Sequence, residues 1–199
     1  MLFVLTGDIQ IGKTRWLQRL TEGLADRGVP VAGVLAPGVW RANPACANGL
    51  EKVGIDNVLL PGGERVAFAR RRDLAVADGT LEYGGQSERE GLGWAMSDAS
   101  IARVDAHFAR LAAAPAPRRP GLLVVDELGR LELALGEGLA HAVGLLAAGP
   151  RPGWLHALVV VRDLLLPLAH ERLDDAWPDG VREIAPTADA RAELLGLYA

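Results

Sequence analysis

Residues 7–14 have the spacing of a phosphate-binding loop. They are Gly-Asp-Ile-Gln-Ile-Gly-Lys-Thr, which is the pattern G-x-x-x-x-G-K-[ST], and they follow the apolar run 2–5. Gly7 and Gly12 allow the backbone to curl so that successive N–H groups converge on a phosphate. The helix that follows adds the positive end of its dipole. The pattern, a Walker A motif, predicts binding of nucleotide phosphates.

Two side chains of this loop could act on the phosphates directly. Lys13 would reach the β- and γ-phosphates, and the Thr14 hydroxyl would ligate Mg²⁺. The chain has 19 arginines but only two lysines, Lys13 and Lys52, so a lysine at this position is informative. We predict a nucleotide-binding segment of nine residues: Gly7, Asp8, Ile9, Gln10, Ile11, Gly12, Lys13, Thr14 and Arg15.

A second motif lies beyond the middle of the chain. Asp126 and Glu127 follow the apolar run 122–125, which is the form of a Walker B motif. Asp126 would sit where a buried strand reaches the carboxyl edge of the sheet, and there it would hold Mg²⁺ together with Thr14. Glu127 would then orient and polarise the water that attacks the γ-phosphate.

Strands and helices alternate along most of the chain, which predicts an α/β fold with a mostly parallel sheet flanked by helices. Helical periodicity begins at Lys13 and continues to about Arg27, where Gly28 is a candidate C-terminal cap. We expect strands at 2–6, 29–35, 122–125, 155–161 and 181–184, and further helices at 98–113, 136–148, 163–170 and 188–197.

The segment 36–96 has a different character. The stretches 53–60 and 64–70 flank Pro61-Gly62-Gly63, which predicts an antiparallel hairpin, and a short strand is expected at 81–83. We interpret 36–96 as a β-rich hairpin insertion within a single P-loop domain that spans 1–199.

Composition narrows the class of protein. The net charge of −4 gives no reason to expect a nucleic-acid partner, and no apolar stretch resembles a membrane span or a signal peptide. Cys46 is the only cysteine, so no intrachain disulfide can form. We expect a cytoplasmic protein with no membrane partner.

The octet 126–133, Asp-Glu-Leu-Gly-Arg-Leu-Glu-Leu, resembles the D-E-I-G-K-M-E-L motif of a family of small nucleoside-triphosphatases of the cancer-related and thermophile type. The resemblance implies a P-loop enzyme that hydrolyses nucleoside triphosphates, such as ATP or GTP, to diphosphate and phosphate with Mg²⁺ and broad base tolerance. The matching residues are Gly7, Gly12, Lys13, Thr14, Asp126, Glu127 and Glu132.

The chain departs from the family pattern at three positions. Gln10 replaces a glycine, Arg15 replaces a Thr or Ser, and Arg130 replaces the lysine of the octet. Arg130 could be catalytic by supplying positive charge to the transition state, or it could anchor the turn at 126–133. Glu132 could lie near the metal or could serve as a capping partner.

Some functional alternatives stay open. The same loop could serve a small-molecule or nucleotide kinase with an acceptor pocket built from 50–96, or a slow ATP-dependent switch or assembly factor. The five tryptophans are expected mainly in the core, although Trp40 or Trp94 could stack on a nucleobase. An acidic residue beside the metal-binding Asp126 favours hydrolysis.

Overall fold

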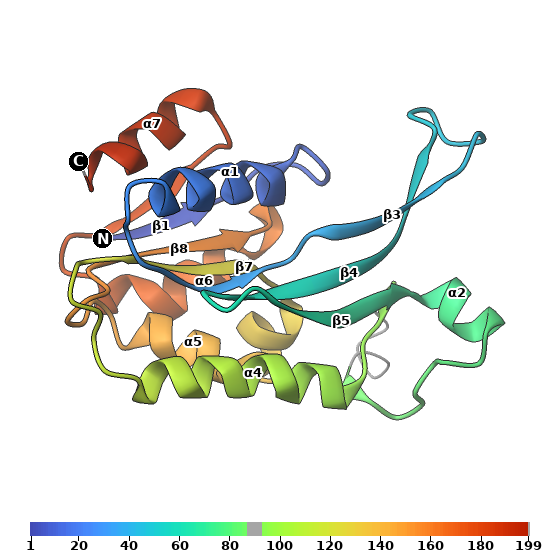
Figure 1. Ribbon diagram of the computed structural model, residues 1–199. Helices are drawn as coiled ribbons and strands as arrows, with labels where there is room; N and C mark the ends of the chain where they lie inside the picture. Colours follow the sequence, from blue (N-terminus) through green and yellow to red (C-terminus); the bar gives the residue numbers. More distant parts are fainter. Residues whose placement is uncertain (87–92, 199) are drawn as a thin grey trace.

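The computed structural model describes residues 1–86 and 93–198, which fold around one sheet (Figure 1). Within the described residues the sheet has nine strands, in the order β6-β5-β4-β2-β7-β8-β1-β9, and β3 pairs with β4 outside this path. The strands are β1 (Leu2–Leu5), β2 (Val31–Leu35), β3 (Gly38–Ala42), β4 (Leu50–Leu60), β5 (Glu64–Arg71), β6 (Trp94–Ala95), β7 (Leu122–Leu128), β8 (His156–Val161) and β9 (Val181–Ile184).

The sheet has a parallel half and an antiparallel half. Strands β2, β7, β8, β1 and β9 run parallel to one another, and the apolar runs of β1, β2, β7 and β8 are buried, as expected for strands covered by helices on both faces. The remaining strands pair antiparallel with one another, and β4 also pairs antiparallel with β2. The predicted α/β class with a mostly parallel core and an antiparallel hairpin is confirmed.

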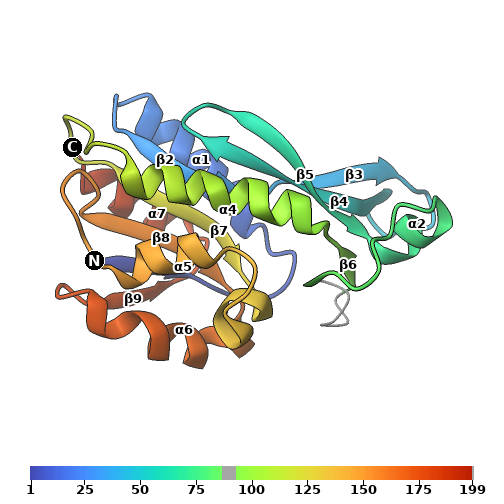
Figure 2. The same ribbon diagram turned by 90° about the horizontal axis from the view of Figure 1, so that it is seen from below.

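Helices cover both faces of the parallel half (Figures 1 and 2). α1 (Lys13–Ala25) and α7 (Ala188–Gly196) lie on one face, and α4 (Asp98–Ala113), α5 (Ala140–Ala147) and α6 (Leu166–Leu173) lie on the other. Each face has its own apolar core. Leu17, Leu20 and Leu24 of α1 pack on the first face, whereas Val104 and Phe108 of α4 pack on the second.

The antiparallel strands form an arm that extends past the end of β2. Only Val58, Leu59 and Leu60 at the end of β4 pair with β2, while the start of β4 pairs with β3. Because β4 runs antiparallel to β2, its first residues lie beyond the carboxyl edge of the parallel sheet. We call the strands β3, β4, β5 and β6 the arm; Figure 1 shows them curving away from the helical layers.

Three expectations about local structure were wrong, and one strand was not predicted. Residues 81–83 form no strand, whereas 38–42 form strand β3 within the expected β-rich segment. The expected helix at 136–148 is shorter, because Gly136 and Gly138 adopt left-handed φ values of +70° and +67° between a π-helix (Leu131–Leu135) and α5. The helix expected from 163 begins as a 3₁₀ turn (Asp163–Leu165). A second 3₁₀ turn (Asp174–Ala176) and a short helix α2 (Arg72–Ala77) complete the described elements.

Residues 87–92, which belong to the predicted insertion 36–96, lie outside the described residues. Among the described helices, none combines the length and the apolar character that crossing a membrane requires.

Candidate active site

The phosphate-binding loop connects β1 to α1 at the carboxyl edge of the sheet. The loop is tightly curled: Gly7 has φ +122°, Gln10 φ +66° and Gly12, the N-cap of α1, φ +96°. These are left-handed values that glycine adopts without strain. Gln10, which stands where the family pattern has a glycine, adopts this conformation at a cost.

The Lys13 ammonium points back over this loop. Its Nζ donates hydrogen bonds to the carbonyl oxygens of Gly7 and Asp8, the latter at 2.8 Å. The side chain is therefore folded over the concave side of the loop, where a positive charge can meet a phosphate. The tip residues Asp8, Ile9, Gln10 and Ile11 are exposed, as is Arg15 on the first turn of α1.

Asp163, which the sequence did not identify, anchors the loop. Its Oδ1 accepts hydrogen bonds from the backbone N–H of Gly7 at 2.7 Å and from the Thr6 hydroxyl. These two hydrogen bonds hold the pKa of the Asp163 carboxyl below its usual value. The loop is thereby fixed to the end of β8, the strand that pairs in parallel with β1, which carries the loop.

Asp126 joins the two predicted motifs. The Thr14 hydroxyl donates to Asp126 Oδ1 at 3.2 Å, although the two residues lie 112 positions apart in the chain. The backbone N–H of Ala36, just after β2, donates to Asp126 Oδ2 at 2.8 Å. Burial raises the pKa of the Asp126 carboxyl to about 6, and these two hydrogen bonds oppose the rise.

Thr14 and Asp126 present the hard oxygen ligands that suit Mg²⁺. Among the described residues there is no cluster of three or more His, Cys, Asp or Glu side chains that could enclose a metal ion. Mg²⁺ usually keeps several waters and takes one or two protein oxygens together with substrate phosphates, so the pair fits this ion. When bound, Mg²⁺ would neutralise charge on the β- and γ-phosphates.

Glu127 has a strained backbone and a basic partner. Its φ is +80°, and the pairing of β7 with β8 is irregular between Val125 and Leu128. A glutamate in the left-handed region persists only where its surroundings hold it there. Arg162 provides one such contact, because its Nε donates to Glu127 Oε1 at 2.5 Å. Arg162 follows β8 and was not identified from the sequence.

Glu132 and Arg130 lie on the turn after β7. Glu132 is buried and accepts hydrogen bonds from the backbone N–H groups of Gly129 at 2.8 Å and Leu139 at 3.2 Å. These contacts are those of a capping partner, and burial raises the pKa of its carboxyl. Arg130 is exposed at the N-cap of the π-helix.

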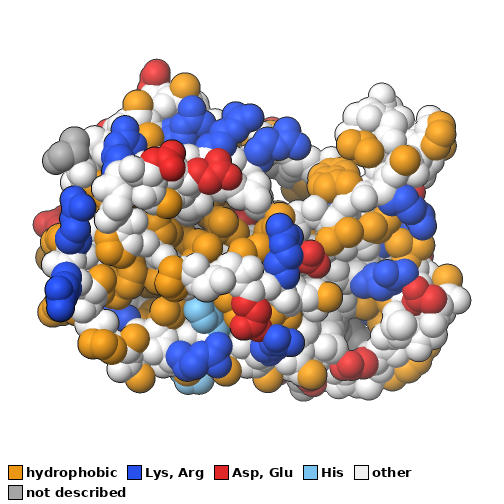
Figure 3. All heavy atoms as spheres, in the orientation of Figure 1, with side chains coloured by type: hydrophobic (Ala, Val, Ile, Leu, Met, Phe, Trp, Pro, Cys, Tyr) orange, Lys and Arg blue, Asp and Glu red, His pale blue; other side chains and the backbone are white. Residues whose placement is uncertain are grey.

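The arm places aromatic and basic side chains beside this site. Trp16 and Trp177 are buried, as expected, but Trp40 on β3 is 43% exposed and Trp94 on β6 is half-buried, so not all tryptophans are core residues. The Lys52 ammonium lies 5.2 Å from the centroid of the Trp94 ring. In the space-filling view a notch separates the phosphate-loop side of the molecule from the arm (Figure 3).

The arm also contains a cavity of about 330 Å³. Its floor is largely apolar, with Val53, Phe68 and Met96 among the lining residues, and Arg70 and Glu82 add charge. The described lining includes no residue of the phosphate loop and neither Asp126 nor Glu127. The cavity is therefore separate from the groups that address phosphate.

A parallel sheet with a Walker A loop bonded to a Walker B carboxylate defines the P-loop NTPase fold. Residues 2–152 match the NTPase family, and the chain belongs to that family. Among solved structures, it is similar to a human cancer-related nucleoside triphosphatase, with a TM-score of 0.59 and 22% identity over 98% of this chain and 93% of the other.

THEP1 from the hyperthermophile Aquifex aeolicus is similar to the same degree, with a TM-score of 0.59 and 16% identity over 100% of this chain and 97% of the other. No curated protein sequence gives a significant match. The expected resemblance to the cancer-related and thermophile nucleoside-triphosphatases is confirmed.

Proposed function

We propose that this protein hydrolyses nucleoside triphosphates to diphosphate and phosphate with Mg²⁺ and accepts different bases. One observation carries the proposal: the hydrogen bond between Thr14 and Asp126 unites the two motifs at one edge of the sheet, with Glu127 adjacent. Family membership supports nucleoside-triphosphate chemistry at this site.

Each residue of the site has a role that follows from its chemistry. Backbone N–H groups of 7–14 and the Lys13 ammonium bind the phosphates, and Thr14 with Asp126 holds the metal. Glu127 orients the attacking water and accepts its proton, because a carboxylate beside the terminal phosphate is suited to that task. Arg162 orients Glu127 through its hydrogen bond.

Arg130 has two candidate roles in this scheme. It is exposed, and it follows the Walker B strand by two residues, so it could supply positive charge to the transition state or only fix the turn. We retain it as a candidate catalytic residue. A loss of kcat without a change in nucleotide affinity in Arg130→Ala would assign it the first role.

A kinase is the second candidate, and the cavity of the arm is the observation that favours it, because a kinase needs a pocket for the phosphate acceptor. The separation of this cavity from the phosphate loop makes hydrolysis the better-supported function. Cytoplasmic location and the absence of membrane and nucleic-acid partners remain expectations.

The test is phosphate release by purified protein with Mg²⁺ and a panel of triphosphates. Steady release by protein alone supports hydrolysis. Transfer that requires an added acceptor indicates a kinase, and stoichiometric binding without turnover indicates a switch. Removal of Mg²⁺ by a chelator should abolish release, and turnover that survives chelation would contradict the metal assignment.

A further inference from the structure

Lys52 is the second of the two lysines in the chain, and it belongs to the arm rather than to the phosphate loop. It lies on β4 directly across from Trp40 on β3, within the part of β4 that extends past the carboxyl edge of the parallel sheet. This position places Lys52 beyond the edge of the parallel sheet at which β1 and β7 lead into the phosphate loop and the Walker B carboxylates.

The Lys52 side chain is held between neighbours. A Cβ atom placed on Gly38 would approach Lys52 Cε to 2.9 Å and Trp40 Nε1 to 2.8 Å, so the aliphatic stem passes close to the bare Gly38 backbone. Its ammonium faces the Trp94 ring at 5.2 Å from the centroid, a cation–π distance. The stem is thus packed while the charged end is directed by aromatic contacts.

The carboxylates of the site act on the Lys52 ammonium electrostatically and form no ion pair with it. Burial lowers the pKa of its ammonium, while the negative charges of Glu127 and Asp126 raise it again and Arg162 opposes them. No ion pair joins Lys52 to any residue in the described part of the chain. The partly buried Lys52 ammonium interacts with the two carboxylates only at long range. It is therefore available to an anion placed between it and those carboxylates.

The order of the strands fixes the direction from which each lysine approaches. Along the sheet, β4 and β1 lie on opposite sides of β7, which carries Asp126 and Glu127. Lys13 comes from the β1 side through the loop, and Lys52 comes from the β4 side through the arm. Asp126 and Glu127 end β7 between these two directions, so a terminal phosphate held beside them is open to Lys13 from one side and to the arm from the other.

We propose that Lys52 binds the terminal phosphate of a bound nucleoside triphosphate from the side opposite Lys13. This inference rests on the proposed function and adds a residue of the arm to the substrate-binding groups. The arm then distinguishes a triphosphate from a diphosphate, because only the triphosphate carries the group that Lys52 contacts. Trp94 and Gly38 act as positioning residues for Lys52.

The first experiment compares affinities. Titrations with Mg²⁺ and either ADP or a non-hydrolysable ATP analogue should show that Lys52→Met weakens analogue binding by at least about tenfold and leaves ADP binding unchanged, as expected for loss of a charged hydrogen bond. Lys52→Arg should retain most of the preference for the triphosphate. Equal affinities of Lys52→Met and wild type for both ligands, or an equal loss for both, would overturn the proposal.

The second experiment uses unaltered protein and does not depend on whether a variant folds. Cleavage after arginine places Lys13 in peptide 1–15 and Lys52 in peptide 42–65, so mass spectrometry resolves acylation of each. Both ligands should protect Lys13, whereas only the triphosphate analogue should protect Lys52. Equal labelling of Lys52 with ADP and with the analogue would contradict the proposal.

The two proposals fail in different ways. If wild-type protein binds and hydrolyses triphosphates while Lys52 is neither protected nor needed for the triphosphate preference, only the role of Lys52 is wrong. If wild-type protein binds no nucleotide and Lys13 is not protected by either ligand, the proposed function fails as well.

Discussion

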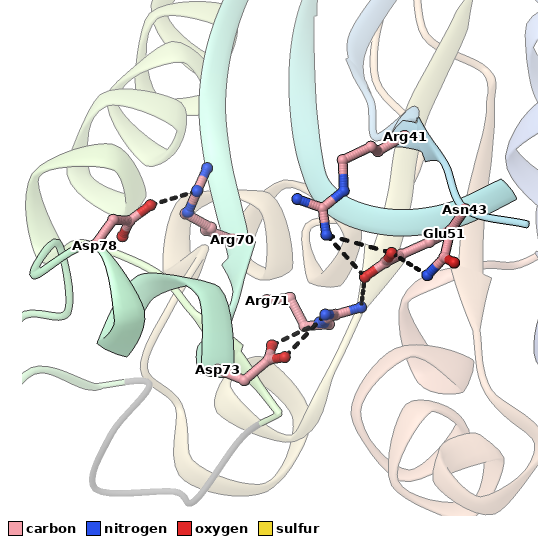
Figure 4. A network of polar contacts seen from close by, with 7 residues as sticks. All are labelled: Arg41, Asn43, Glu51, Arg70, Arg71, Asp73 and Asp78. Atoms are coloured by element: carbon pink, nitrogen blue, oxygen red, sulfur yellow. Dashed lines mark hydrogen bonds and ion pairs between the residues drawn. The ribbon is translucent and has the colours of Figure 1, made fainter. Parts of the chain in front are cut away.

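The parallel half and the arm differ in the contacts that their polar side chains make. In the parallel half, the functional side chains lie at one sheet edge and bond to one another or to backbone, as Thr14 does with Asp126 and Gly7 with Asp163. In the arm, charged side chains mostly form exposed pairs, as Arg70 does with Asp78 and Arg65 with Asp56. Glu51 is the exception, because it is buried and contacts Arg41, Asn43 and Arg71 (Figure 4).

This difference indicates that the two regions have different functions. A site whose polar groups are fixed by contacts between distant segments is preorganised, and preorganised donors are effective at stabilising charge that develops in a transition state. Within the sheet, the strands of the arm pair with the parallel half only through β4 and β2, and β4 and β5 also contact helix α4. We expect the parallel half to supply phosphate chemistry and the arm to adjust which substrate is bound.

The largest expected effect is in the parallel half. Lys13→Ala should reduce hydrolysis by roughly 10³-fold or more, because a cation on the β- and γ-phosphates stabilises charge in the transition state. Steady-state phosphate release measures the loss, with Arg19→Ala, an exposed site on the same helix, as the matched control. Near wild-type turnover in a folded Lys13→Ala protein would place the active site elsewhere.

Two carboxylates of the parallel half should separate into two roles. Glu127→Gln should lower kcat by at least about 10²-fold, the range for loss of a general base, while Mg²⁺ and nucleotide still bind. Asp126→Asn should instead raise the Mg²⁺ concentration needed for half-maximal activity. Glu22→Gln on the exposed side of α1 is the control. The opposite pattern would mean that the roles are reversed.

Base preference tests whether the arm contributes discrimination. Phosphates and Mg²⁺ are common to all nucleoside triphosphates, and aromatic rings such as Trp40 and Trp94 stack on any base with little selectivity. The values of kcat/KM for ATP, GTP, CTP and UTP should therefore fall within about 30-fold, or roughly 2 kcal/mol. A preference near a thousandfold for one base would show that base-specific hydrogen bonds exist.

The smallest effect is expected from the polar network of the arm. Glu51→Gln should speed amide hydrogen exchange in β3 and β4 and leave the parallel strands unchanged, because it removes a charge that three side chains share. Glu64→Gln, which breaks an exposed pair with Arg103, is the control. Equal acceleration in both halves would show that the arm is not an independent unit.

The same network has a predictable pH dependence. The hydrogen bond from Asn43 and the contacts with Arg71 and Arg41 hold the pKa of the Glu51 carboxyl below its usual 4.5. A lowered pKa in the folded protein stabilises the arm above the usual value, and this stabilisation disappears as the pH falls through the folded value. The difference in exchange between Glu51→Gln and wild type should shrink below about pH 4.5.

The sequence predicted those parts of the site that depend on short-range spacing. The loop 7–14 and the pair Asp126–Glu127 each follow an apolar strand, and the expectation that these strand ends meet at one edge of the sheet was sound. Arg162 and Asp163 also follow an apolar strand, at 157–161. That position was a usable signal, but only the strand order shows that they lie beside the loop and Glu127.

Strand β3 and Lys52 could not be found from the sequence for a different reason. The stretch 38–42 contains neither strict alternation nor a buried run, because most of β3 is exposed and its pairing with β4 is irregular after Val39. Lys52 is a candidate phosphate-binding residue only because β4 is long enough to extend past the end of β2. The fold of the parallel half was thus predictable, whereas the reach of the arm was not.

Arg162 and Asp163 are adjacent in the chain, yet one holds Glu127 and the other holds Gly7 of the phosphate loop. Their Cα atoms are separated by one peptide unit, about 3.8 Å. The phosphate loop and Glu127 therefore share one support, the residue pair at the end of β8. If Glu127 orients the attacking water as proposed, this shared support keeps the phosphate-binding loop and that carboxylate in a fixed relation to each other.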